Sequence, residues 1–458
     1  NGNPADDDES DPVGDPTPLT GPVFTKFNTF LAQLNFLELI VSGDQPLPVT
    51  VTVFNLFGQQ MAQELVTVPA NSQRDIDINS LVRLACSLGN NCTNVDTGIP
   101  FQDLDGNGTV DTYGLVRIDF STTENVELLG RLANYRPNPG TSTFSFAFAR
   151  ELLNSFEGVT YAPSNTIDPQ GRGFLVPNWA EIINLEVAQA FLYEIFDSNG
   201  TLVFSETTEV LDPGREKDLQ GGHELATPGT YLTRVTPLSG GKYLYSMARY
   251  SSNSTGASAD SFNFAFAVAG RKGAQVRQYA LLSNLEAPAW TQSNSLELLN
   301  TSNSAINATV VFRDASTIFD TQTFTIQPRA QIEIDAGTLL GLRGATQGIA
   351  EVVSDTAGTL IAQSIVYYRN RADGSVETAY ITPAKTPDGT VIAGSTNTFL
   401  TMSNTIRMAA TTATTQTLAI NARGLIIQPD NSIVFTSEDT SIVLPGTASL
   451  SVELSDIS

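Results

Sequence analysis

The chain has 458 residues, a length that predicts three or four domains. It carries 48 acidic and 24 basic residues, and its formal net charge of −24 argues against nucleic acids and anionic membranes as partners. No apolar run of about 18 residues occurs, which argues against insertion into a membrane.

Residues 1–22 form an acidic N-terminal tail that is rich in proline and glycine. The tail lacks the apolar content to fold alone. The chain begins at Asn1 instead of Met, so we expect that an N-terminal export signal was removed. This indicates an extracellular or cell-surface protein.

Short stretches with alternating apolar residues recur through residues 23–163. Turn residues separate about seven expected strands, at residues 35–39, 49–54, 64–68, 75–78, 114–120, 126–135 and 144–149. This spacing is typical of an immunoglobulin-like β-sandwich. We therefore expect a first β-sandwich over 23–163, interrupted by an insertion.

The insertion contains the only two cysteines of the chain, Cys86 and Cys92. A disulfide that closes so short a loop stabilises a protein by on the order of 2 kcal/mol. Its presence would point to an oxidising compartment. No other cysteine or histidine is nearby, which argues against a zinc site.

A loop with oxygen-bearing side chains at alternate positions follows the cysteines. Such a loop can wrap one calcium ion, with glycine at the bend. The candidate ligands are the side chains of Asp103, Asp105, Asn107 and Asp111 and the main-chain carbonyl of Thr109. The alternative is an Asp/Asn/Gly turn that joins two strands.

The loop resembles the first nine positions of the EF-hand and dockerin loop. It departs from that pattern at the twelfth position, where Gly114 replaces a bidentate acid. The resemblance implies a structural calcium ion, which we expect to stiffen the insertion.

The stretch Phe-Ser-Phe-Ala-Phe-Ala at residues 144–149 returns as Phe-Asn-Phe-Ala-Phe-Ala at residues 262–267. Such a repeat predicts duplicated domains, with the phenylalanines on the inner face of each sandwich. We expect a second sandwich over 164–280 and a third over 281–385, whose last strand, 376–381, is a weaker version of the phenylalanine strand.

Residues 386–458 form a fourth, partial repeat. Asn-Thr-Phe-Leu at 397–400 matches the same letters at 28–31, and expected strands follow at 417–420, 433–435 and 448–454. Three later strands have no counterpart. The expected fold is therefore all-β, with tandem immunoglobulin-like sandwiches of which the last is incomplete.

The recurrent signature runs Asn-x-Leu-Glu-Leu, Val-Thr-Val, a turn, Ile-Asp-Ile and a strand that ends in tyrosine. It resembles the tandem immunoglobulin-like or fibronectin-type-III-like modules of secreted bacterial surface proteins. That resemblance implies stalks, adhesins and fibres without intrinsic catalysis.

Few residues suggest an enzyme. His223 is the only histidine, and no nucleophile elbow accompanies it. Trp179 and Trp290 open the second and third repeats, where a core or interdomain role competes with sugar stacking. We therefore expect a protein without catalytic activity.

A sandwich that lacks three strands exposes its core and an unpaired sheet edge. We expect a subunit of a surface fibre, filament or layer that joins head to tail through its incomplete C-terminal domain. The strand-like residues 22–30 of the next subunit are a candidate for covering that edge. The alternative is a monomeric adhesin or carbohydrate-binding stalk, with surface glycans as partners.

Overall fold

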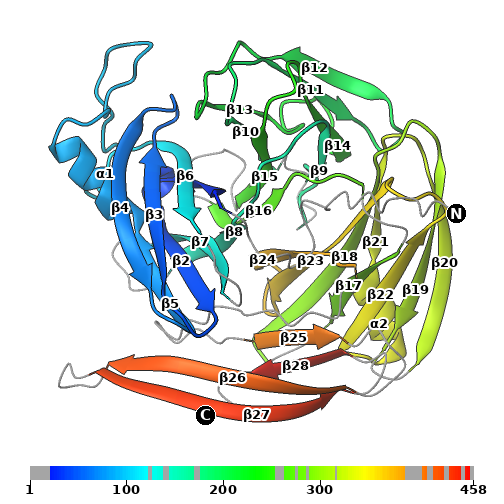
Figure 1. The fold of residues 1–458 in the computed structure, drawn as a ribbon. Helices are drawn as coiled ribbons and strands as arrows, with labels where there is room; N and C mark the ends of the chain where they lie inside the picture. The colour runs from blue at the N-terminus through cyan, green and yellow to red at the C-terminus, as the bar shows by residue number, and fades with distance from the viewer. Residues whose placement is uncertain are drawn as a thin grey trace, which may run out of the picture.

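The computed structural model describes residues 21–121, 126–137, 144–169, 176–252, 262–273, 277–284, 288–314, 317–386, 405–409, 416–427, 433–444 and 449–453. These residues form three β-sandwiches and a smaller C-terminal unit, as Figure 1 shows. Of the expected tail at residues 1–22, residues 1–20 lie outside this part of the chain.

The first sandwich has eight strands, a single-turn 3-10 helix η1 and one α-helix. Its elements are β1 (Val23–Asn28), η1 (Phe30–Ala32), β2 (Leu34–Ser42), β3 (Leu47–Phe54), β4 (Gln60–Val68), β5 (Ser72–Asp77), α1 (Ile78–Ser87), β6 (Tyr113–Phe120), β7 (Glu127–Pro137) and β8 (Phe144–Glu151).

The second sandwich, whose described residues include no helix, has the same eight strands. They are β9 (Thr160–Asn165), β10 (Asn178–Asn184), β11 (Phe191–Phe196), β12 (Leu202–Thr207), β13 (Glu216–Gln220), β14 (Thr230–Pro237), β15 (Tyr243–Ser252) and β16 (Phe262–Ala269).

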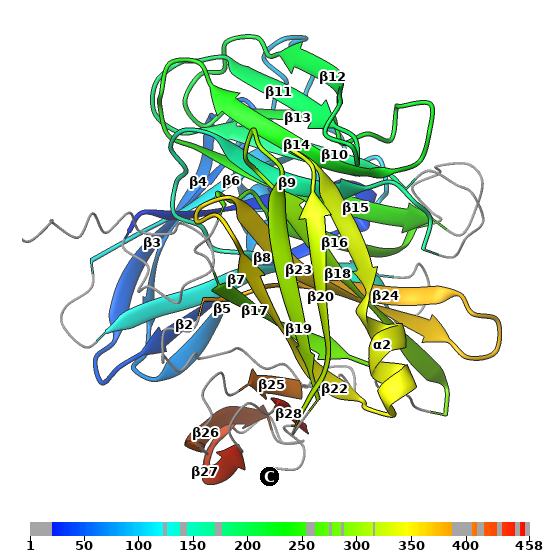
Figure 2. The ribbon, with the colours of Figure 1, turned by 90° about the vertical axis from the view of Figure 1, so that its right-hand side faces the viewer.

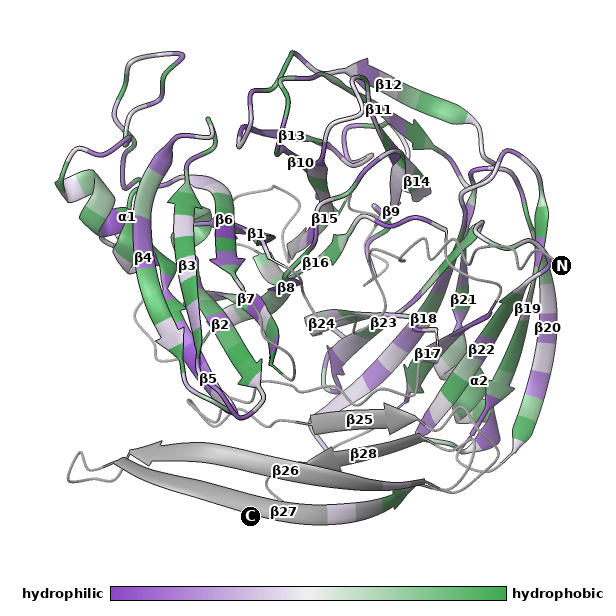
Figure 3. Cartoon of the chain, in the orientation of Figure 1, coloured by the Kyte–Doolittle hydropathy of each residue, from purple (hydrophilic) through white to green (hydrophobic). Residues whose placement is uncertain are grey.

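The third sandwich repeats the pattern of the first. Its elements are β17 (Arg277–Ser283), β18 (Trp290–Asn300), β19 (Ile306–Arg313), β20 (Ile318–Ile326), β21 (Gln331–Asp335), α2 (Ala336–Arg343), β22 (Gln347–Ser354), β23 (Leu360–Asn370) and β24 (Val376–Pro383). Hydrophobic and hydrophilic residues alternate along strands such as β3 (Figure 3), which lets one face of a sheet cover the core.

All three sandwiches share one strand order. In each, strands 1-6-3-4 form one antiparallel sheet and strands 5-2-7-8 form the other. The expected tandem all-β sandwiches are confirmed. The immunoglobulin-like type is not, because strand 1 pairs with strand 6, whereas the immunoglobulin order places it in the sheet of strands 2, 4 and 5.

The eighth strand was missed because β1, β9 and β17 are edge strands with one paired neighbour each, and β9 contains Pro163, which usually marks a strand end. β9 and β17 span the expected boundaries at 163/164 and 280/281. Residues 22–30, a candidate strand for another subunit, supply β1, which pairs with β6 of its own sandwich.

Two short helices were not expected from the sequence. The side chain of Asp77 accepts a hydrogen bond from the main-chain N–H of Ser80 at the start of α1. Asp335 accepts one from the N–H of Thr338 at the start of α2. These side chains accept hydrogen bonds from N–H groups that have no partner within the first helical turn. The first helix was not predicted because the alternating residues of β5 come directly before it.

The last strands of the three sandwiches meet at the centre of the molecule (Figure 1). We expected their phenylalanines inside each sandwich. Instead, Phe146 and Phe148 of β8 form one cluster with Phe264 and Phe266 of β16 and Tyr367 of the third sandwich. The sandwiches therefore surround a shared apolar centre, an arrangement that differs from an extended stalk.

One docking contact occurs twice between successive sandwiches. The turn between β3 and β4 reaches the second sandwich, where a Cβ on Gly58 would lie 2.5 Å from the carbonyl oxygen of Pro213. The turn between β11 and β12 places Gly200 against the carbonyl of Pro328 in the third sandwich. Each hairpin therefore docks on the corner between strands 4 and 5 of the next sandwich.

The C-terminal unit consists of β25 (Thr405–Ala409), β26 (Gln416–Ile427), β27 (Ile433–Leu444) and β28 (Ser449–Glu453). β25 pairs with β28 and β26 with β27, both antiparallel, as β2 pairs with β5 and β3 with β4. β28 contacts β22, and Figures 1 and 2 show the unit below the third sandwich. The expected strand at 397–400 lies outside the described residues.

We predict that Gly200→Ala weakens the contact between the second and third sandwiches. Gly200 has φ +79°, and an added Cβ would overlap the Pro328 carbonyl. Gly240→Ala is the matched control, because Gly240 has φ +75° with nothing within 4 Å. In urea unfolding, Gly200→Ala should lose about 1–3 kcal/mol more than this control. Equal losses would contradict the docking contact.

Candidate functional site

Each sandwich presents a pair of opposed acidic residues on the outer face of its 5-2-7-8 sheet. We call this surface the acceptor face, because a preceding sandwich can dock on it. The opposed pairs are Glu38 and Asp75, Glu181 and Asp218, and Glu297 and Glu333. Successive side chains of a strand point to opposite faces of the sheet. These acids therefore point away from the core, while the apolar residues beside them in the sequence point into it.

The acceptor face of the second sandwich is covered by two basic side chains of the first. Lys26 Nζ lies 2.9 Å from Glu181 Oε1 and 3.1 Å from Asp218 Oδ1, and it also forms an ion pair with Glu216. Arg150 Nη2 donates to Glu181 Oε1 at 3.0 Å. The side chains of Lys26, Arg150 and Glu181 are at most 5% exposed, so this cluster is buried.

Burial and charge act in opposite directions on these groups. Burial raises the pKa of Glu181, but Arg150 and Lys26 outweigh it and hold the pKa at about 2. Burial raises the pKa of Glu216 well above its ordinary value, despite the attraction of Lys26. Glu216 is therefore the carboxyl in this cluster that holds a proton most readily.

The acceptor face of the third sandwich is covered by the second. Arg249 Nη1 lies 3.1 Å from Glu297 Oε1, with both side chains at most 2% exposed. Gln363 Nε2 donates to the other oxygen of Glu297 at 2.5 Å, and Asn165 Nδ2 donates to Glu333 Oε2 at 2.7 Å. The same role is thus filled by a different basic residue on a different strand.

Apolar residues surround these acids at one repeated position. Ile183 and Leu244 are opposed in the second sandwich, and Leu299 and Ile361 in the third. All four are at most 4% exposed. Leu299 and Ile361 pack against residues of the second sandwich. Docking of a preceding sandwich therefore buries this position.

The acceptor face of the first sandwich differs from these two. Ile40 and Leu129, the opposed pair at the same position, are only half-buried, and Asp75 is exposed. Glu38 pairs with Arg131 of its own sandwich, with Arg131 Nε 2.6 Å from Glu38 Oε2 and the arginine side chain 39% exposed. Among the described residues, no preceding sandwich covers this third copy of a surface that is buried twice elsewhere.

The expected disulfide is confirmed. Cys86 and Cys92 are bonded, with their Cα atoms 5.2 Å apart. The bond joins the end of α1 to the loop that leads toward the expected calcium ligands.

The candidate calcium residues lie on one exposed turn. Asp103 accepts hydrogen bonds from the N–H groups of Gly106 and Gly108, at 2.7 and 2.8 Å. Asn107 accepts one from the N–H of Thr109 at 2.7 Å, and Asp105 accepts one from Ala32 of η1. Hydrogen bonds from main-chain N–H groups to these side-chain oxygens therefore hold the backbone of the turn.

Asp111 and Thr109 are the buried residues of this turn, and Asp111 carries the buried carboxylate. Burial and the nearby carboxylates of Asp105 and Asp103 together raise its pKa to about 6, against the opposing effect of the hydrogen bond from the N–H of Leu104. Its Oδ1 is buried without a hydrogen-bond partner among the described residues. A cation would suit this oxygen. However, the described residues contain no group of three or more His, Cys, Asp or Glu arranged to hold a metal ion, so calcium binding stays a prediction.

The other candidates are held in packing contacts. His223 Nδ1 accepts the N–H of Asn178 at 3.3 Å, its ring lies 4.6 Å from that of Trp179, and burial lowers its pKa. The Trp290 ring lies 4.9 Å from that of Tyr368. Among the residues described, no helix is long and apolar enough to cross a membrane.

Comparisons with known proteins identify no relative. No protein-family model matches the chain, and no curated protein matches it. Among solved structures, the Bacteroides uniformis beta-glucuronidase aligns over 50% of this chain and 26% of its own, with 9% identity and a TM-score of 0.12.

A second solved structure is a tetra-tandem repeat in the extending region of a large adhesion protein. It aligns over 94% of this chain and 90% of its own, with 11% identity and a TM-score of 0.10. TM-scores this low carry no argument about fold or function.

Sequence reasoning missed the acceptor faces, although a signal was present. The second strand of each sandwich contains the pattern Asn-x-x-Glu, whose glutamates are Glu38, Glu181 and Glu297. A charged residue at the same place in three apolar strands indicates a shared buried partner. The basic partners were harder to find, because they come from different strands.

We predict that Glu181→Gln destabilises the protein by about 3–5 kcal/mol, because Lys26 and Arg150 then lose the carboxylate that they share. Urea unfolding at pH 7 measures this loss. Asp119→Asn is the control, since its partner Arg117 is 44% exposed and the exposed pair contributes about 1 kcal/mol or less.

The loss should also depend on pH. The folded pKa of Glu181, about 2, lies below its ordinary value of 4.5. The stability that ionised Glu181 gives the folded protein is therefore fully present above about pH 4.5 and is lost as the pH falls toward 2. The gap between wild type and Glu181→Gln should narrow over that window. A gap that stays constant with pH would contradict this role.

Proposed function

We propose that this chain is a non-enzymatic extracellular structural protein, the subunit of a surface fibre, filament or layer that assembles head to tail. The observation that carries the proposal is the open acceptor face of the first sandwich. Its Ile40 and Leu129 are half-buried, whereas both equivalent pairs are covered by a preceding sandwich. A second copy supplies the missing cover.

The C-terminal unit supplies the complementary end. In a complete sandwich, strand 2 pairs with strands 5 and 7, and strand 3 with strands 4 and 6. In the described part of residues 405–453, β25 and β26 each have one paired neighbour. An open strand edge accepts a strand from another chain through main-chain hydrogen bonds.

The docking hairpins suggest how the two ends meet. β26 and β27 pair as β3 and β4 do, and the β3–β4 turn docks on the strand 4–5 corner of the next sandwich. The corner of the first sandwich, at Pro69 and Asn71, is exposed. We therefore place the β26–β27 hairpin of one copy on this corner and acceptor face of the next. Contacts between unlike ends give open filaments.

An extracellular setting agrees with two further properties. The Cys86–Cys92 disulfide persists in an oxidising compartment. The net charge of −24 keeps individual subunits soluble before they assemble.

We predict that Ile40→Glu abolishes assembly while the fold remains intact, because it places a charge on a half-buried apolar face. Leu65→Glu is the control, since Leu65 is 73% exposed on β4, outside this face. Electron microscopy and sedimentation velocity should show polymers of wild type and Leu65→Glu, and monomers of Ile40→Glu.

A strictly monomeric wild type, also after calcium is restored, would contradict the assembly proposal. Monomers that bind glycans, and that lose this binding on Trp290→Ala, would instead support the adhesin.

We also propose that the Asp103–Asp111 turn binds a structural calcium ion. Oxygen ligands suit this ion, and the orphaned Asp111 Oδ1 gives it a place to bind. Calcium at 100 times its dissociation constant should stabilise the wild type by about 2.7 kcal/mol, measured as a rise in Tm. Asp105→Asn should remove that rise. No change in Tm up to about 10 mM calcium would contradict the site, because extracellular modules bind calcium below that concentration.

A further inference from the structure

A cavity of about 190 Å³ lies where the three sandwiches meet. We propose that it binds a small monocarboxylate with an apolar body of about six to eight carbons. This proposal is independent of assembly, because the cavity is formed within a single chain.

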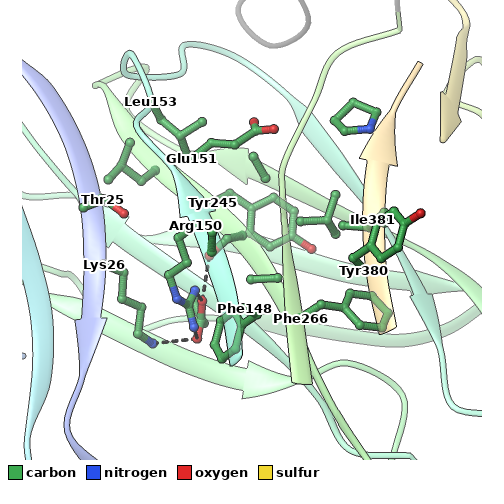
Figure 4. A pocket seen from close by; sticks show the side chains of 18 of the residues that line it. Thr25, Lys26, Phe148, Arg150, Glu151, Leu153, Tyr245, Phe266, Tyr380 and Ile381 are labelled. Atoms are coloured by element: carbon green, nitrogen blue, oxygen red, sulfur yellow. Dashed lines mark hydrogen bonds and ion pairs between the residues drawn. The ribbon is translucent and has the colours of Figure 1, made fainter. Parts of the chain in front are cut away.

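The cavity is built by all three sandwiches. Figure 4 shows Phe148 of β8, Phe266 of β16 and Ile381 of β24 around it, with Leu153 and Tyr245 behind. Most of the wall is hydrocarbon. A concave, mainly apolar site with a few convergent polar groups is the usual form of a small-molecule site.

Small side chains keep the cavity open. Ala147 and Ala149 of β8, Ala267 and Ala269 of β16, and Ala379 of β24 all line it. Protein interiors normally fill such space, because each void forfeits packing energy. Here alanines of the repeated Phe-x-Phe-Ala-Phe-Ala strand line a volume beside β8 and β16 that larger side chains would fill, and Ala149 is exposed.

One wall of the cavity carries charged side chains. Lys26, Arg150 and Arg271 line it together with two acids, Glu151 and Glu181, and Lys26 also pairs with Glu216 and Asp218. Glu181 already accepts from Arg150 and Lys26.

Arg150 provides the specific donor. Its side chain is 5% exposed, and its terminal nitrogens bind Glu181. Its Nε is buried and has no hydrogen-bond partner among the described residues. A buried N–H without an acceptor is costly, and a ligand carboxylate would satisfy it with a charge-assisted hydrogen bond.

The size of the cavity limits the apolar body. An engineered cavity of about 150 Å³ with apolar walls stays dry and binds benzene. A volume of about 190 Å³ therefore has room for one aromatic ring or a short aliphatic chain with its carboxylate. Benzoate and hexanoate are suitable probes of these two shapes.

Isothermal titration calorimetry on the full chain tests the proposal, with benzoate, hexanoate, benzyl alcohol and benzylamine as ligands. We expect saturable binding of benzoate or hexanoate, and binding of the alcohol and the amine at least about tenfold weaker. No saturable binding of either acid up to about 10 mM would overturn the proposal, because the weakest useful sites bind near 1 mM. Equal binding of benzoate and benzylamine would overturn the carboxylate assignment.

Two variants locate the site. Ala267→Leu fills the cavity and should weaken benzoate binding at least about tenfold. Ala62→Leu is the control, because Ala62 is a partly buried strand alanine of β4 that does not line the cavity, and it should bind as wild type does. Unchanged binding by Ala267→Leu would overturn the site.

A measurement on the unmodified protein removes the dependence on how variants fold. Benzoate should shift the methyl NMR signals of Ala147, Ala267 and Ala379, which line the cavity from three sandwiches. It should leave the Ala62 signal unchanged. Shifts confined to surface alanines would also overturn the proposal.

Discussion

The burial of a strand glutamate beneath basic side chains of the preceding sandwich is the constraint on which this arrangement depends. Glu181 and Glu297 lie in the middle of apolar strands, where an unpaired carboxylate would be very costly. Arg150 and Lys26 satisfy the first, and Arg249 satisfies the second. Because buried ion pairs roughly break even in energy, they fix how the sandwiches dock, while the shared phenylalanine cluster supplies the net attraction.

The sequence predicted what depends on local pattern. The alternation of apolar residues identified most strands, and the repeated phenylalanine strand identified the duplicated sandwiches. The first strand of each sandwich was missed, since a short edge strand such as β9 carries a proline and pairs on one side only. The packing of the three sandwiches was also beyond the local pattern, because it joins residues that are far apart in sequence, from 31 positions for Arg150 and Glu181 to more than a hundred for Phe146 and Phe264.

Part of the candidate site could likewise be predicted from the sequence, and part could not. The disulfide was predictable because two lone cysteines stand six positions apart, and it is confirmed. The calcium residues Asp103 to Asp111 lie on the loop between α1 and β6, and calcium binding there stays a prediction. The acceptor faces depend on pairs such as Arg150 with Glu181, whose partners come from different sandwiches. No spacing rule relates such residues, so only the repeated glutamate pointed to them.

The two covered faces use different chemistry for the same contact. The first sandwich contacts the acids of the second with Lys26 on β1 and Arg150 on β8. The second contacts those of the third with Arg249 on β15. The sandwiches are therefore not interchangeable. A chain with the second and third sandwiches exchanged would bury acids without matching bases, and a stray copy that docked in the wrong register would meet the same penalty. Three sandwiches of nearly the same fold on one chain could dock on the wrong neighbour while the protein folds. The different positions of their basic residues favour the correct order of docking.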